Sequence, residues 1–276
     1  MTCYRHPNRE TYVSCSECGR PICTECMTPA PVGQRCPEHS GKPQGVHRVT
    51  AGVRRSAYQG VGSPVTKALV AINVLVYLAE IAQGAGVNAT SGSIFEHGAL
   101  YGPSVANGDW WRLVTSMFLH YGPVHLGLNM LALWWFGSVL EQILGSGRFL
   151  LVYLVSGLAG SAGALIDNPN AVTVGASGAI FGILGAMLII EYQRTGTLLG
   201  NAFILIAVNL IFGFSLGSGT IAVGGHIGGL VGGIASILVL SRFGRGHAAY
   251  SRLGAIGIGA VLAIGAASIV ISYLSV

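Results

Sequence analysis

Hydrophobic residues are arranged along this chain in seven long runs that are separated by less hydrophobic segments. Each run is close to the about 20 residues that a helix needs to cross the hydrocarbon core of a bilayer. The pattern predicts seven membrane-spanning helices, at residues 65–82, 124–144, 149–166, 175–192, 198–216, 221–240 and 253–276. The segment between the first two runs, 83–123, is rich in aromatic residues but too interrupted to cross, so we interpret it as a structured loop partly embedded in the interface.

Composition supports the same fold class. Charged residues make up only 9% of the chain and hydrophobic residues 51%, whereas charged residues make up about 25% of a typical soluble domain. We therefore expect an all-α integral membrane protein. No apolar run precedes residue 65, so no signal peptide is expected. The net charge of +5 does not indicate nucleic-acid binding, because the basic residues are scattered between the runs.

Basic residues also predict the orientation in the membrane, because cytoplasmic loops are enriched in lysine and arginine. With a cytoplasmic N-terminus, the opposite side holds only Arg112. The cytoplasmic segments then hold Arg48, Arg54, Arg55, Lys67, Arg148, Arg194, Arg242, Arg245 and Arg252. We expect a multi-pass cell-membrane protein with its N-terminus in the cytoplasm.

Residues 1–40 contain all six cysteines of the chain. An even number of cysteines is compatible with three disulfides, but the cysteines and two histidines form four pairs with identical spacing. The pairs are Cys3 with His6, Cys15 with Cys18, Cys23 with Cys26, and Cys36 with His39. This spacing is typical of tetrahedral zinc sites, and a reducing cytoplasm favours zinc over disulfides. Eight ligands predict two structural zinc ions.

The order of these pairs resembles a B-box-type zinc finger, in which the pairs interleave. The resemblance implies that Cys3, His6, Cys23 and Cys26 hold one ion. It assigns Cys15, Cys18, Cys36 and His39 to the other. A module this short buries little core, so the metal is expected to provide much of its stability. We expect the basic segment 41–64 to be a flexible linker.

Two apolar helices are predicted to pack closely through stripes of small residues spaced four apart. One stripe comprises Gly178, Gly182 and Ala186, and the other comprises Gly225, Gly229 and Gly233. Such spacing places each stripe on one helix face and allows two backbones to approach. Ser177 and His226 are each adjacent in sequence to the first glycine of a stripe. Packing of the two helices would therefore bring them together as a nucleophile and its base. Taken alone, Ser177 is better explained as a routine small residue at a helix contact, and His226 is equally compatible with a structural hydrogen bond.

A third polar cluster opens the second run, where His125 and Asn129 share a helix face at i and i+4. They are able to donate hydrogen bonds to a developing oxyanion, or simply to join helices. All three clusters lie at the same ends of their spans, and together they supply the three roles that acyl transfer needs. Because Asp109 and Asp167 lie in loops, we expect a Ser–His dyad and not a triad.

Four motifs together resemble the signature set of the rhomboid intramembrane serine proteases. They are Trp111-Arg112, His125-x3-Asn129, Gly175-x-Ser177-Gly178 and Gly225-His226-x2-Gly229-x3-Gly233. The resemblance covers roughly residues 65–240 and implies a six-helix core, with the seventh run as the extra helix of "six plus one" members. It implies that Ser177 is the nucleophile and His226 the general base. It further implies an oxyanion hole formed by His125, the Asn129 side chain and the Ser177 backbone N–H.

By this resemblance the chain is expected to be an enzyme that cleaves single-span transmembrane proteins in or near the outer end of their span. The alternatives are an inactive relative that binds membrane clients, and a transporter or channel. The expected domains are a zinc module at 1–40, a linker at 41–64, a protease core at 65–240, and a loop with the seventh helix at 241–276. The module is expected to bind a cytoplasmic protein or only to stabilise the chain.

Three further polar residues carry expectations. We expect Glu80 to reach water from the end of the first span. We expect His120 to lie in the interface, the alternative being that it assists the oxyanion region. Glu141 and Arg148 flank the turn after the second span, where an ion pair or a lipid headgroup contact is expected.

Overall fold

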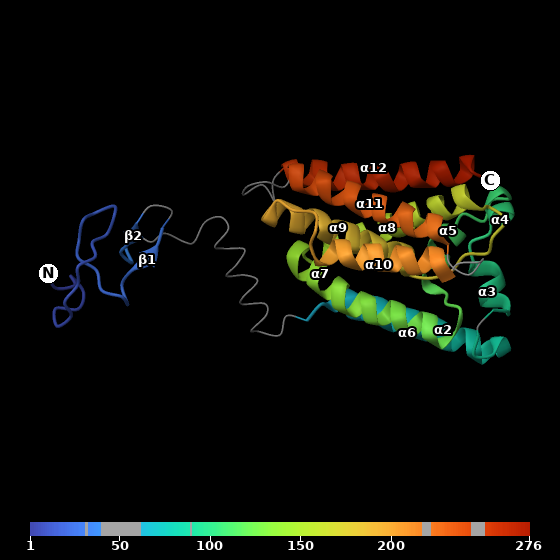
Figure 1. The fold of residues 1–276 in the computed structure, drawn as a ribbon, viewed down its shortest axis with the longest axis horizontal. Helices are drawn as coiled ribbons and strands as arrows, with labels where there is room; N and C mark the ends of the chain where they lie inside the picture. Colours follow the sequence, from blue (N-terminus) through green and yellow to red (C-terminus); the bar gives the residue numbers. More distant parts are fainter. Residues whose placement is uncertain (31–32, 40–61, 89, 217–221, 244–251) are drawn as a thin grey trace. The chain divides into compact units, whose positions relative to one another are not determined.

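The computed structural model describes residues 1–30, 33–39, 62–88, 90–216, 222–243 and 252–276. The chain divides into two compact units, Met1–Gln59 and Gly60–Val276 (Figure 1).

The first unit is a small module with little regular structure. Its strands β1 (Thr28–Pro29) and β2 (Gln34–Arg35) pair antiparallel. Its core consists of Ile22 and five buried cysteines, with Tyr4, Val13 and Met27 packed against them. A core built largely from thiols offers little hydrophobic stabilisation, which agrees with a fold that depends on bound metal.

The second unit is a bundle of helices. Its elements are α2 (Pro64–Glu80), η1 (Ile81–Ala85), α3 (Ser93–Gly98), α4 (Gly102–Ala106), α5 (Arg112–Thr115), η2 (Ser116–Phe118), α6 (Gly122–Ala132), η3 (Leu133–Gly137), α7 (Ser138–Leu144), α8 (Ser146–Asp167), α9 (Ser177–Thr195), α10 (Asn201–Leu216), α11 (Val223–Phe243) and α12 (Arg252–Leu274). Each predicted run therefore forms a helix. The second unit is therefore an all-α membrane bundle, as the composition predicts.

Five helices in the described part of the chain are long and apolar enough to cross a membrane. They are Pro64–Ala85, Gly122–Leu144, Ser146–Asp167, Val223–Arg242 and Ala255–Leu274. The fourth and fifth predicted runs form α9 and α10, which are not among these five helices. α9 carries the charged residues Glu191 and Arg194 near its end, and α10 is short, with 16 residues.

The segment before the second span folds into short helices that Arg112 holds together. Arg112 is 6% exposed, and its Nε donates to Oδ2 of Asp109 at 2.9 Å. It also donates to the carbonyls of Glu96 and Ala99, both at 2.8 Å. A buried charge is tolerated only when it is paired in this way. Arg112 is therefore an anchor of this loop.

α11 packs against α8 and α9, and α12 covers α8 and α11 (Figure 1). Glycines allow this contact. A Cβ atom at Gly229 would lie 1.9 Å from the carbonyl oxygen of Gly178, and one at Gly233 would lie 2.0 Å from that of Gly182. The predicted packing of the two small-residue stripes is confirmed. α8 joins them, since a Cβ at Gly163 would lie 2.2 Å from the Gly224 oxygen.

Two acids of this unit are buried, and for Glu80 the expectation of reaching water is wrong. Glu141 is buried and accepts the backbone N–H groups of Val65 and Thr66 at 3.1 and 2.8 Å, and the hydroxyl of Ser146 at 2.6 Å. It thus binds the start of α2 and forms no ion pair with the described residues, whereas the expected headgroup contact stays a prediction. Glu80 is 1% exposed, because neighbouring elements cover it and it cannot reach water.

Candidate active site and metal sites

Ser177 is the first residue of α9, and Gly175 shapes the turn that leads to it. Gly175 has φ +128°, a conformation that residues with a side chain rarely adopt. A Cβ at this position would lie 2.7 Å from Cε1 of His125. The glycine therefore allows the His125 ring to lie against the backbone just before Ser177.

His226 lies in the first turns of α11, and its Nε2 is 2.9 Å from Oγ of Ser177. The two residues are 49 positions apart and meet because α9 and α11 run side by side through their glycines. The imidazole stacks on Phe181, with ring centroids 4.2 Å apart and planes at 11°. Phe181 is therefore a site residue that the sequence analysis missed. Its signal was available, since it follows Ser177 by four residues on one helix face.

Hydrogen bonding assigns the proton of neutral His125 to one ring nitrogen. The backbone N–H of Tyr121 donates to Nδ1 of His125 at 3.3 Å. Because Nδ1 is then the acceptor, Nε2 carries the proton in the neutral ring. A Cβ at Gly175 would lie 2.9 Å from this Nε2. The ring thus presents an N–H donor beside the backbone that leads to Ser177.

Asn129 lies one turn further along α6 and is 6% exposed. Its side-chain N–H donates to the backbone carbonyl of His125 at 2.9 Å. The structure therefore places Asn129 on the same face as His125. Its expected donation to an oxyanion stays a prediction.

His120 is fully buried, with its ring centroid 5.1 Å from that of His125. Burial, aided by the nearby His125, lowers the pKa of His120 to about 3, so its ring is neutral at physiological pH. The expectation that His120 lies in the interface is wrong. It instead packs behind His125 and supports that ring.

Asp167 lies at the end of α8, and its carboxylate contacts the start of α11. Its Oδ2 accepts the backbone N–H of Gly224 at 3.3 Å, two residues before His226. In the described residues, Nδ1 of His226 has no hydrogen-bond partner. The arrangement is therefore a serine–histidine pair without an orienting acid on the imidazole. A hydroxyl bonded to an imidazole in this way is a candidate nucleophile with its general base.

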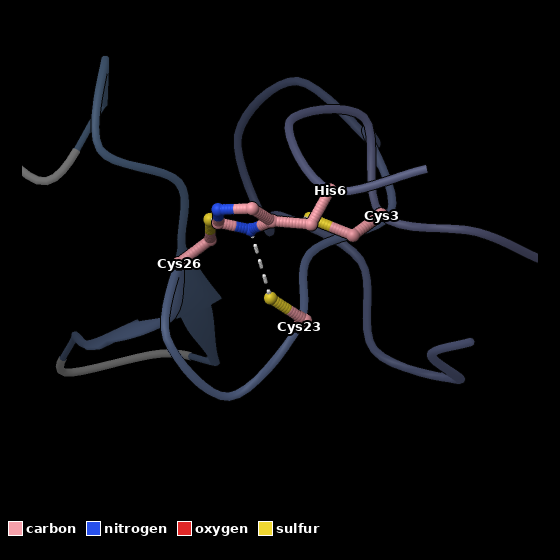
Figure 2. Close-up of side chains that lie close together, drawn as sticks. All are labelled: Cys3, His6, Cys23 and Cys26. Atoms are coloured by element: carbon pink, nitrogen blue, oxygen red, sulfur yellow. Dashed lines mark hydrogen bonds between the residues drawn. The ribbon is translucent and has the colours of Figure 1, made fainter. Parts of the chain in front are cut away.

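The cysteines and histidines of the first unit gather into two groups. They are Cys3, His6, Cys23 and Cys26, and Cys15, Cys18, Cys36 and His39, with ligand atoms all within 4.8 Å of one another in each group. Figure 2 shows the first group converging from separate loops. All six cysteines are free thiols in the structure. The grouping is the interleaved one that the B-box resemblance implies.

Distances between the ligand atoms test whether the groups fit a metal. Tetrahedral zinc bonds of about 2.3 Å to sulfur and about 2.0 Å to nitrogen place neighbouring ligand atoms roughly 3.5–3.8 Å apart. Nδ1 of His6 lies 3.4 Å from Sγ of Cys23 and 3.3 Å from Sγ of Cys26. In the second group, Sγ of Cys18 and Sγ of Cys36 are 3.8 Å apart. Both groups are therefore able to hold a metal ion, and a ligand set of three cysteines and one histidine suits zinc.

Comparisons with known proteins agree with this site. Residues 107–243 match the family described as "Rhomboid domain". The chain is 40% identical over 172 residues to Rhomboid protease GluP of Bacillus subtilis (strain 168), which covers 61% of this chain and 33% of that protein. It is 47% identical over 95 residues to Putative rhomboid protease YdcA of the same organism, covering 34% of this chain and 48% of that protein.

A plant relative shows the same likeness. RHOMBOID-like protein 7 of Arabidopsis thaliana is 38% identical over 148 residues, covering 52% of this chain and 47% of that protein. The chain thus spans from about a third to about half of the length of these curated relatives. The matched region contains both Ser177 and His226. With its helical bundle and this matched region, the chain belongs to the rhomboid family.

Proposed function

We propose that this chain is an intramembrane serine endopeptidase that uses Ser177 and His226 as a catalytic dyad. The observation that carries the proposal is the 2.9 Å contact between Nε2 of His226 and Oγ of Ser177, made by two helices in glycine-mediated contact. An unassisted serine hydroxyl is a weak nucleophile near neutral pH, and an adjacent base activates it. Family membership supports the same activity.

In the proposed mechanism, His226 takes the Ser177 proton as Oγ bonds to the scissile carbonyl carbon. The peptide C–N bond then breaks, and His226 passes the proton to the leaving amine. The substrate's acyl group remains on Ser177 as an ester until water, deprotonated by His226, attacks the same carbon. The Ser177 hydroxyl is regenerated when the ester bond breaks.

The oxyanion formed in each step needs hydrogen-bond donors. We assign this role to Nε2–H of His125, the Asn129 side chain and the Ser177 backbone N–H. The Tyr121 N–H on Nδ1 of His125 supports the first assignment, because it leaves the proton on Nε2. Phe181 positions the His226 ring by stacking on it.

The proposed substrates are single-span transmembrane proteins, cut in or near the outer end of their span. The one-sided distribution of basic residues supports a cytoplasmic N-terminus, which places the start of α9 toward the outer face. Water would then reach the dyad from that face.

The first unit is proposed to carry two structural zinc ions in the cytoplasm. The two groups of three cysteines and one histidine support this assignment, since four protein ligands close each site and leave no open position for catalysis. A module of this kind acts by binding another protein or by stabilising the chain to which it belongs.

A fluorophosphonate probe tests the dyad directly. We expect covalent labelling of Ser177 in the detergent-solubilised full-length protein, with labelling lost in Ser177→Ala and reduced at least about 100-fold in His226→Ala. His97→Ala is the matched control, because His97 is an exposed histidine of α3 that bonds within its own helix. Equal labelling of the His226→Ala and His97→Ala proteins would refute the dyad.

The same proteins distinguish a protease from an inactive relative that only binds membrane clients. A client-binding protein would retain a single-span substrate without cutting it, in the Ser177→Ala variant and the parent alike. We expect the parent to release two fragments and the Ser177→Ala variant to release none.

A further inference from the structure

A cleft of about 600 Å³ lies at the end of α9 that is remote from Ser177. It is bounded by η3 and α7 on one side and by α10 on the other, with α9 between them. Its walls are apolar and include Trp135, Val139, Ile190 and Leu205. Trp135 is 62% exposed and Val139 is 45% exposed, so this wall faces the surroundings of the bundle. In a membrane those surroundings are acyl chains.

The rim of the cleft carries one acid and one base, and only the acid is engaged. The Glu191 carboxylate accepts the backbone N–H groups of Asn201 and Ala202, at 3.1 and 3.2 Å. These groups belong to the first turn of α10, where the helix dipole favours a negative charge. Arg194 lines the same rim and is exposed, with no hydrogen bond or ion pair to the described residues. The available charge at the rim is therefore positive.

We propose that this cleft binds one anionic phospholipid, whose acyl chain lies between η3–α7 and α10 and whose phosphate pairs with Arg194. An apolar wall that ends in a free cation at the helix terminus is complementary to a lipid, which has both parts in the same order. Basic pockets between transmembrane helices bind anionic headgroups for this reason. The inference goes beyond the proposed protease activity and does not depend on it.

Quenching of tryptophan fluorescence by brominated acyl chains tests which lipid occupies the cleft. The full-length protein is reconstituted in phosphatidylcholine vesicles that contain a small fraction of brominated phosphatidylglycerol or of brominated phosphatidylcholine. We expect phosphatidylglycerol to bind about fivefold more tightly, which is the preference that one headgroup–arginine contact provides. This selective quenching should vanish in Trp135→Phe. It should persist in Trp134→Phe, because Trp134 is also exposed but does not line the cleft.

Charge variants test the headgroup contact. Arg194→Gln should abolish the preference for phosphatidylglycerol, and Arg194→Lys should retain most of it, which shows that the protein still folds with position 194 changed. Arg242→Gln is the matched control, because Arg242 is an exposed arginine in the last turn of α11, at the same end of the bundle. It should leave the preference unchanged.

Three outcomes would overturn the proposal. They are equal quenching by the two lipids, a preference that survives Arg194→Gln, and a preference that survives Trp135→Phe. Displacement of the quencher by an equimolar single-span substrate would instead identify a substrate helix as the occupant.

Discussion

At the scale of single residues, the candidate active site depends on the absence of a side chain at Gly175. With φ +128° and no Cβ, this residue leaves the space that the His125 ring fills. The ring in turn receives the Tyr121 N–H on Nδ1, which leaves its other nitrogen as a donor. One glycine therefore controls whether His125, the proposed oxyanion donor, reaches the region of Ser177.

We expect Gly175→Ala to lower the rate of probe labelling at Ser177 by about 100-fold, because the new methyl group displaces the His125 ring and small misplacements cost that much. Gly108→Ala is the control. Gly108 has a similar φ of +106°, yet a Cβ there meets nothing within 4 Å. The control thus carries the backbone strain without the collision and should label normally. Equal losses in the two variants would attribute the effect to backbone strain.

Asn129→Ala is expected to lower kcat by about 10²–10³ with little change in KM, because an oxyanion donor acts mainly on the transition state. Steady-state cleavage of a single-span substrate measures both constants. Asn209→Ala serves as the control, since Asn209 makes the same bond to the carbonyl four residues earlier, at 2.8 Å, on α10. A variant with normal kcat and a raised KM would contradict the role assigned to Asn129.

At the scale of elements, α8, α9 and α11 form a three-helix contact in which glycines replace side chains. Gly229 and Gly233 of α11 lie against the carbonyls of α9, and Gly228 lies against Ala159 of α8. Such approach strengthens van der Waals packing, which drives helix association where lipid removes the hydrophobic effect. It also sets the separation of α9 and α11, on which the contact between Ser177 and His226 depends.

Gly229→Ala should therefore destabilise the bundle by about 1–3 kcal/mol, since its methyl group would overlap the Gly178 carbonyl. Thermal unfolding in detergent measures the loss, and probe labelling reports the dyad. Gly259→Ala on α12 is the matched control, because a Cβ there meets nothing within 4 Å. It should be neutral or slightly stabilising, as alanine favours helices over glycine. An unchanged unfolding temperature in Gly229→Ala would show that the helices do not need this close contact.

At the scale of the whole molecule, the chain combines a metal-binding unit with a membrane bundle. The first unit holds both groups of three cysteines and one histidine, and the second unit holds Ser177 and His226. Each unit has a core of its own. This division suggests that the chemistry at Ser177 needs only the second unit.

We expect a chain that starts at Gly60 to be labelled at Ser177 at close to the full-length rate and to contain no zinc. The full-length protein should contain about two zinc ions, because each group of three cysteines and one histidine closes one tetrahedral site. Elemental analysis and probe labelling measure the two properties. A truncated protein that unfolds normally but resists labelling would make the first unit part of the catalytic machinery.

The sequence by itself determined the features that follow from local pattern. Hydrophobic runs predicted the helices because the cost of placing polar residues in lipid acts along each segment. Two intervening residues between the members of each cysteine or histidine pair predicted the metal-binding groups, since this spacing lets both members of a pair reach one ion. The glycine stripes predicted the contact of α9 with α11, which brings Ser177 to His226 across 49 positions.

Only the tertiary structure decided the surroundings of individual polar and aromatic side chains. Glu80 and His120 are buried, and Glu141 binds the start of α2. Phe181 stacks on His226, a contact that depends on how α11 is rotated against α9. The physical reason is that the neighbours of each of these residues come from other helices. Local sequence specifies that a helix forms, whereas burial and partners arise only when the helices pack.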